Sequence, residues 1–206
     1  MLRKSVFLLM TVGLGMSFAA ENLLVLKIGP TWPKALQWSK KPTAWDASVQ
    51  GGWVFDRKLA FGGGIDFLWN VNKQTTPISG GGTSYRIENV QKSFMFPISG
   101  FLALTPIPDF RVHPCASVQI GLNTLYYSNS ADSVLATALR ESGWYMGFYC
   151  KLAADAVLNL GDKSGLFAGV EYQWATADKL NPGASDILTQ RKMGAFGLRM
   201  GFRVLY

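Results

Sequence analysis

Apolar residues alternate with small or charged ones along the end of the chain, residues 191–206. One set of alternate positions is apolar or aromatic: Phe196, Leu198, Met200, Phe202, Val204 and Tyr206. The other set is small or charged until its last member: Ala195, Gly197, Arg199, Gly201, Arg203 and Leu205. A period of two residues places each set on one face of a β-strand. This pattern is typical of a strand with lipid on one side and a polar lumen on the other.

Similar alternation marks earlier parts of the chain and predicts eight strands: 23–29, 44–55, 59–70, 90–105, 111–126, 143–158, 166–176 and 191–206. Long connections at 30–43, 71–89, 127–142 and 177–190 alternate with short ones at 56–58, 106–110 and 161–165. This rhythm predicts an all-β fold, namely an eight-stranded antiparallel transmembrane β-barrel. The barrel would have four long outer loops and three short periplasmic turns.

Some local features modify this picture. Pro30 and Pro33 are expected to exclude pairing, which makes residues 30–43 a loop. Pro97 lies inside a strand and cannot donate to its neighbour, so we expect a bulge within residues 97–100. Residues 132–140 are compatible with a short helix in the third long loop.

Aromatic residues gather at the two ends of the predicted strands. Four tryptophans lie where strands meet long loops: Trp45, Trp69, Trp144 and Trp174. A second group lies near the short turns: Trp53, Phe55, Phe61, Phe202 and Tyr206. Two aromatic belts around an aliphatic band are what the two interfaces of a bilayer select.

The N-terminal residues indicate that the protein is exported. Residues 1–19 have the form of a cleaved secretory signal peptide, with Arg3 and Lys4 before a short apolar core and a small-residue cleavage site. The remaining residues 20–206 are expected to form one barrel domain. The net charge of +7 falls to +5 without Arg3 and Lys4, and in an exported chain it does not indicate nucleic-acid binding.

The end of the chain carries a recognisable motif in Arg199, Gly201, Val204 and Tyr206. It resembles the terminal assembly signal of the small eight-stranded outer-membrane barrels, such as the OmpA transmembrane domain and the OmpX/Ail group. Val204 departs from that signal, where an aromatic is usual. The resemblance implies the outer membrane of a Gram-negative bacterium and recognition by the barrel-assembly machinery. The expected surroundings are outer-membrane lipid and lipopolysaccharide, and the expected state is a monomer.

Inward positions collect charges of both signs, expected to pair in a lumen charge network: Lys27, Asp46, Asp66, Arg111, Lys151, Asp155, Glu171, Arg199 and Arg203. An eight-stranded barrel is just wide enough for side chains to fill it. Unpaired charges inside would be costly, so we expect Glu171 to bridge an arginine, Arg199 by depth. The lumen is therefore predicted to be polar and largely occluded.

The sequence shows no catalytic, cofactor or metal site. His113 is the only histidine, and register arguments keep Cys115 and Cys150 apart. The first long loop is basic and aromatic and could bind lipopolysaccharide phosphates or a glycan, or be a solvated interfacial loop: Trp32, Lys34, Trp38, Lys40 and Lys41. The sequence favours a non-enzymatic structural or surface-interaction protein. A narrow channel for small solutes is the alternative, and an outer-leaflet lipid enzyme is a third possibility.

Overall fold

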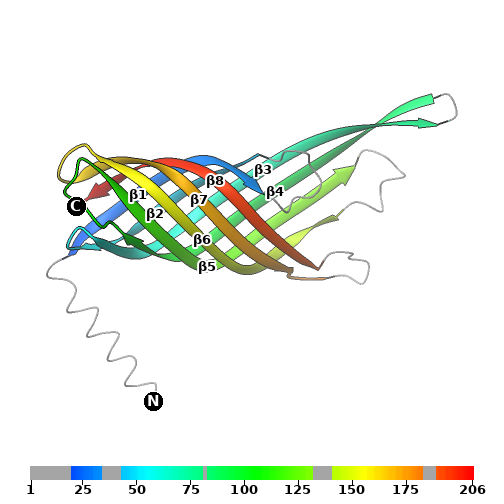
Figure 1. The fold of residues 1–206 in the computed structure, drawn as a ribbon. Helices are drawn as coiled ribbons and strands as arrows, with labels where there is room; N and C mark the ends of the chain where they lie inside the picture. The colour runs from blue at the N-terminus through cyan, green and yellow to red at the C-terminus, as the bar shows by residue number, and fades with distance from the viewer. Residues whose placement is uncertain (1–19, 34–42, 81–82, 132–140, 183–188) are drawn as a thin grey trace, which may run out of the picture.

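The computed structural model is a closed barrel of eight strands in chain order (Figure 1). The structure describes residues 20–33, 43–80, 83–131, 141–182 and 189–206. Its strands are β1 (Ala20–Pro33), β2 (Ala44–Phe55), β3 (Leu59–Gly80), β4 (Thr83–Leu104), β5 (Val112–Ala131), β6 (Glu141–Asn159), β7 (Ser164–Lys179) and β8 (Gln190–Leu205). All neighbours are antiparallel, as predicted.

The barrel closes where the last strand meets the first. β8 pairs with β1 in a register that joins Leu26 to Phe202. Beyond the strand, Tyr206 and Asn22 exchange two backbone hydrogen bonds of 3.0 Å. The chain end is therefore tied into the sheet, which leaves no open edge at the closure.

The side chains are distributed as the alternation predicts, with polar groups inside and apolar groups outside. Asp66, Lys151 and Gln119 are among the most buried residues, whereas Ile65 and Leu122 are more than half exposed. This inverted burial is expected where the outer surface faces lipid. None of the described residues belongs to a helix long and apolar enough to cross a membrane.

Aromatic contacts form two belts on the outer surface. Near the long-loop end, Tyr126 packs on Trp144 with ring centroids 5.1 Å apart, and Tyr172 on Trp174 at 4.5 Å. At the short-turn end, Phe61 packs against Trp53 at 5.5 Å. The predicted belts are present.

The first short turn shows why the chain reverses so tightly. The Lys58 amide donates to the Phe55 carbonyl at 3.0 Å. Asp56 and Arg57 have φ of 47° and 52°. Two positive φ values at the central positions are those of a type I′ turn, whose twist matches that of the flanking strands.

Two prolines lie inside strands, which corrects the predicted loop start and bulge. The β1–β2 ladder continues through Pro30, which pairs with Trp45, so the loop does not begin there. At Pro97 the β3–β4 ladder is interrupted, yet Ile65–Ile98 and Leu68–Met95 keep one register across the gap. No extra residue is inserted. A one-sided gap in the ladder accommodates the missing donor of proline without a bulge.

The region 71–89, predicted to be a loop, is mostly a hairpin. β3 and β4 pair continuously from Asn70–Ser93 to Gly80–Thr83. The prediction was wrong because a hydrophobic period reports only strands with one buried face. The predicted signal peptide, residues 1–19, and the predicted helix, residues 132–140, lie outside the described residues.

Candidate functional site: a polar plug in the lumen

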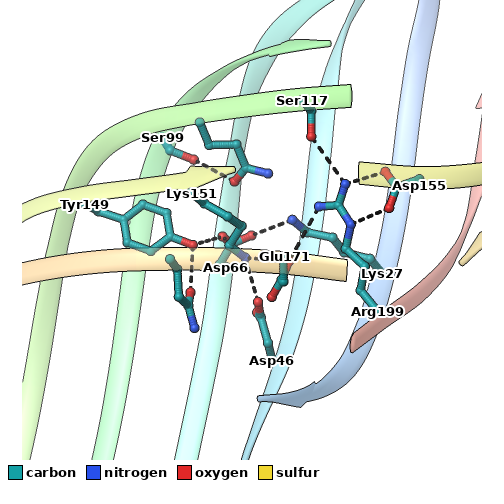
Figure 2. A network of polar contacts seen from close by, with 12 residues as sticks. Lys27, Asp46, Asp66, Ser99, Ser117, Tyr149, Lys151, Asp155, Glu171 and Arg199 are labelled. Atoms are coloured by element: carbon teal, nitrogen blue, oxygen red, sulfur yellow. Dashed lines mark hydrogen bonds and ion pairs between the residues drawn. The ribbon is translucent and has the colours of Figure 1, made fainter. Parts of the chain in front are cut away.

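Lys151 lies at the centre of the lumen, fully buried (Figure 2). Its Nζ is 2.6 Å from Asp46 Oδ2, 2.9 Å from Asp66 Oδ2 and 3.3 Å from Glu171 Oε2. These carboxylates come from β2, β3 and β7, and Lys151 itself comes from β6. One ammonium group therefore joins four strands across the inside of the barrel.

Arg199 extends this cluster towards the short turns. Its Nε donates to Asp155 Oδ1 at 2.7 Å, and its Nη2 contacts the other oxygen of the same carboxylate. Arg199 Nη1 lies 3.5 Å from Glu171 Oε2, so the expected Glu171–Arg199 contact is present. Lys27 Nζ is 3.6 Å from Asp66 Oδ1. We call these seven residues the lumen plug: Lys27, Asp46, Asp66, Lys151, Asp155, Glu171 and Arg199.

Uncharged side chains add polar contacts around the plug. The Tyr149 hydroxyl lies 2.8 Å from Asp66 Oδ2 and 3.1 Å from Gln173 Oε1. Arg199 Nη2 also donates to Ser117 Oγ at 3.3 Å. Ser117 and Gln173 are not among the predicted network residues, although both occupy inward positions that strand parity identifies.

Tyrosines fill the lumen between the plug and the long-loop end. Tyr127, Tyr145 and Tyr149 are almost completely buried. The guanidinium of Arg191 lies 3.6 Å from the centroid of the Tyr127 ring, a cation–π contact. The plug and these tyrosines therefore occupy successive levels of the lumen, from its middle towards the long-loop end.

Two of the nine predicted network residues are not part of the plug. Arg111 is exposed and precedes β5, because the strand begins at Val112, one residue later than predicted. Arg203 faces inward, but its Nη2 lies 2.9 Å from Asn159 Oδ1 and 3.0 Å from His113 Nε2. Without these two cations, the plug holds four carboxylates against three bases.

The plug is not arranged as a metal site. Within the part of the chain that the structure describes, no group of three or more His, Cys, Asp and Glu side chains could hold a metal ion. The three carboxylates nearest one another, those of Asp46, Asp66 and Glu171, converge on an amine instead. What the arrangement can do is cross-brace the strands and block passage.

The lumen is not filled to its short-turn end. A cavity of about 550 Å³ lies on that side of the plug, with Lys27, Asp155 and Arg199 in its lining. Cys115 also lines it, whereas Cys150 pairs with Ile120 on an outward position. Both thiols are free.

The residues predicted to carry assembly and surface binding lie in two places. In the terminal motif, Arg199 and Gly201 face the lumen, Val204 is half-buried, and Tyr206 is 67% exposed. Trp32 belongs to β1 rather than to a loop and stacks on Phe196 with centroids 6.3 Å apart. The other residues of the predicted binding loop lie outside the described residues: Lys34, Trp38, Lys40 and Lys41.

No protein-family model and no curated protein matches the sequence. Among solved structures, Neisserial surface protein A matches with a TM-score of 0.60 and 13% identity, covering 91% of this chain and 99% of that one. This chain has the fold of the small outer-membrane barrels. With the apolar outer band, this fold confirms the expected setting, the outer membrane of a Gram-negative bacterium.

Two further structures align over similar shares of the chain at lower TM-scores. Ail of Yersinia pestis, in complex with the heparin analogue sucrose octasulfate, has 12% identity and a TM-score of 0.48, covering 90% of this chain and 99% of that one. The outer-membrane protein OprG from Pseudomonas aeruginosa has 12% identity and a TM-score of 0.45, covering 91% and 97%.

Proposed function

We propose that the protein is a non-enzymatic outer-membrane barrel with a structural or surface-interaction role and a closed lumen. The observation that carries the proposal is the hairpin of β3 and β4, which projects from the end opposite the short turns (Figure 1). β2 pairs with β3 only as far as Trp69, and β5 pairs with β4 only as far as Asn89.

Beyond those points the hairpin is a two-stranded ribbon. Pairs from Thr75–Glu88 to Gly80–Thr83 have no third strand beside them among the described residues. At about 3.3 Å per residue, this part extends about 20 Å. Its edges present backbone N–H and C=O groups, which can accept a strand from a partner. A ribbon held out in this way is suited to contact at the cell surface.

The contacts of His113 support the absence of histidine-based catalysis. His113 Nδ1 lies 3.1 Å from the Phe110 carbonyl, so it carries the proton and donates there. His113 Nε2 then accepts from Arg203 at 3.0 Å. Both ring nitrogens are engaged, at the end of the barrel away from the long loops. Because fold alone does not decide activity, this local chemistry is the relevant support.

The proposed partners follow from the membrane setting. They are outer-membrane lipid and lipopolysaccharide around the barrel, and the assembly machinery during biogenesis, with the mature barrel a monomer that binds no nucleic acid. The basic residues between β1 and β2, Lys34, Lys40 and Lys41, are proposed to meet lipopolysaccharide phosphates. A narrow solute channel is the second candidate, since the cavity opens the short-turn end of the lumen; it would require passage through the plug.

Shortening the ribbon tests the surface role. We would replace residues 75–88 by Asn-Gly and display both forms on a Gram-negative host at equal surface levels. Cells would be applied to an array of glycans and extracellular-matrix proteins, with Lys58→Gln on the opposite rim as the control. We expect the shortened form to keep its heat-modifiable migration and lose array binding, while the control keeps both. Equal binding by all forms would count against the ribbon as the interaction surface.

A further inference from the structure

The walls of the cavity at the short-turn end differ chemically. The wall from β1 to β4 carries the buried apolar cluster Leu23, Val54, Ala60 and Phe101 near the rim, with Lys27 and Gln50 deeper in the lumen. The wall from β5 to β8 carries Cys115, Asp155, Arg199 and Arg203 beside the apolar Val157, Phe167 and Leu205. The apolar side chains face inward, so contact with lipid does not account for them. They do not fill the space either, since about 550 Å³ remains open beside them.

Arg203 brings an uncompensated positive charge to this cavity. The His113 tautomer deduced above is neutral, because Nδ1 holds the proton and Nε2 accepts from Arg203. Asn159 Nδ2 donates to the carbonyls of Pro108 and Phe110, both at 3.2 Å, which turns its Oδ1 towards Arg203. Among the described residues, the ion pairs of the lumen leave Arg203 without a carboxylate.

The neutral partners also hold the guanidinium in place. Arg203 Nη2 lies 2.9 Å from Asn159 Oδ1 and 3.0 Å from His113 Nε2, so one edge of the group is fixed before any ligand arrives. A donor that is already ordered loses less entropy on binding. Arginine also presents a planar set of donors that matches a carboxylate or a phosphate.

The rim itself is close to charge balance. Its lining has Arg57, Lys58 and Arg111 against Asp109 and Asp162, and Lys58 lies 3.6 Å from Asp56. The deeper charges Lys27, Asp155 and Arg199 are paired within the lumen plug. The positive charge that the cavity offers to a ligand is therefore that of Arg203.

We propose that this cavity binds a small amphipathic anion, with its anionic head on Arg203 and its apolar tail against Leu23, Val54 and Phe101. The volume lies within the range of about 300–1,000 Å³ that is usual for small-molecule sites. The ligand enters from the short-turn rim, and the lumen plug forms the far end of the pocket. The pocket is thus a binding site and not a passage.

Cys115 offers a reporter inside the pocket. In a Cys150→Ser variant it is the only thiol, since the chain has two cysteines. The barrel would be placed in lipid nanodiscs and treated with iodoacetamide, and the alkylation rate of Cys115 would be followed by mass spectrometry. Three probes separate the contributions: octanoate has charge and tail, octanol has the tail alone, and acetate has the charge alone.

Octanoate is expected to slow alkylation about tenfold when present at about ten times its Kd, because the occupied pocket excludes the reagent. Octanol and acetate should each protect far less. Arg203→Gln should abolish the octanoate effect and Arg203→Lys should retain part of it. Val54→Asn should weaken octanoate protection through the other wall. Lys192→Gln, an exposed change towards the opposite end of β8, serves as the matched control.

The results that overturn the proposal are equally specific. They are an octanoate effect no larger than that of octanol, retained protection in Arg203→Gln, or no alkylation of ligand-free Cys115 in the folded barrel. Should Arg203→Gln fail to insert, the three probes on the parent barrel together with Val54→Asn still decide the question.

Discussion

At the residue scale, Lys151 connects more of the interior than any other side chain of the plug. Its three carboxylate partners lie within 3.3 Å and belong to three other strands. A buried ion pair is weak evidence for stability as such, because desolvation offsets much of the attraction. Removing one partner is different, since it leaves the other charges buried and uncompensated.

Lys151→Met is therefore expected to destabilise the barrel by about 3–5 kcal/mol, because Asp46, Asp66 and Glu171 lose their common cation. Urea unfolding in lipid vesicles, followed by tryptophan fluorescence and gel mobility, measures the change. Lys58→Met is the control: Lys58 contacts Asp56 at 3.6 Å on an exposed turn and should have little effect. Equal stability of the two variants would show that the plug does not brace the strands.

Two facing glycines set how closely β2 and β3 approach on the inner side. Gly52 pairs with Gly62, and a Cβ on Gly52 would lie 2.1 Å from the Phe61 carbonyl oxygen. At Gly51, on the outer side, the nearest atom would be 3.9 Å away. We expect Gly52→Ala to cost about 1–3 kcal/mol and Gly51→Ala to be close to neutral in the same urea assay. Comparable effects at both positions would contradict the close approach.

Strand parity was sufficient to predict which charges face the lumen, but not which of them meet. Lys151 and Asp46 are 105 residues apart and come from β6 and β2, which are not neighbours in the sheet. Their contact depends on the depth at which each strand crosses the lumen, and therefore on registers that a single sequence does not fix. The same reason explains why the alternation did not reveal that Arg203 pairs with neutral groups.

At the element scale, β8 closes the barrel and carries the terminal motif. Tyr206 lies outside the last strand but is held to Asn22 by two backbone hydrogen bonds, with its ring exposed. Phe202 faces outward beside Leu26 of β1. The chain end therefore combines closure of the sheet with an exposed aromatic surface.

Deleting Tyr206, or changing Phe202 to Asp, should lower the amount of membrane-inserted barrel. The deletion removes the two bonds to Asn22 and the terminal aromatic, and the aspartate would face lipid. Heat-modifiable protein in isolated outer membranes is the readout. Arg57→Gln, on an exposed turn at the same end, is the control. Normal insertion of both variants would show that the terminal motif has no role in assembly.

The elements were predicted best where one face is buried. Residues 44–55 match β2 at both ends, and the turn 56–58 is as expected. Prediction failed in residues 71–89, where β3 and β4 extend beyond their neighbours. A two-stranded ribbon has no buried face, so its sequence need not alternate between apolar and polar residues. It also failed at Pro30 and Pro97, since composition does not show that a ladder can tolerate a gap on one side.

At the scale of the whole molecule, the lumen has three layers. The cavity lies at the short-turn end, the plug across the middle, and the buried tyrosines towards the long loops. The sequence predicted charge pairing in the lumen but not the cavity at its short-turn end, because a void depends on how side chains of all eight strands fit together. We propose that the plug and the tyrosines close the barrel to solutes.

Single-channel recording of the purified barrel in planar bilayers tests the closure of the lumen most directly. The wild type should show no large, steady conductance, because Lys151, its three carboxylates and Tyr149 contact one another across the lumen. Glu171→Ala should lower thermal stability and raise conductance, since it frees one side of Lys151 and Arg199. Lys58→Gln on the rim should leave the trace unchanged. A large, steady conductance from the wild-type protein would contradict the closed lumen.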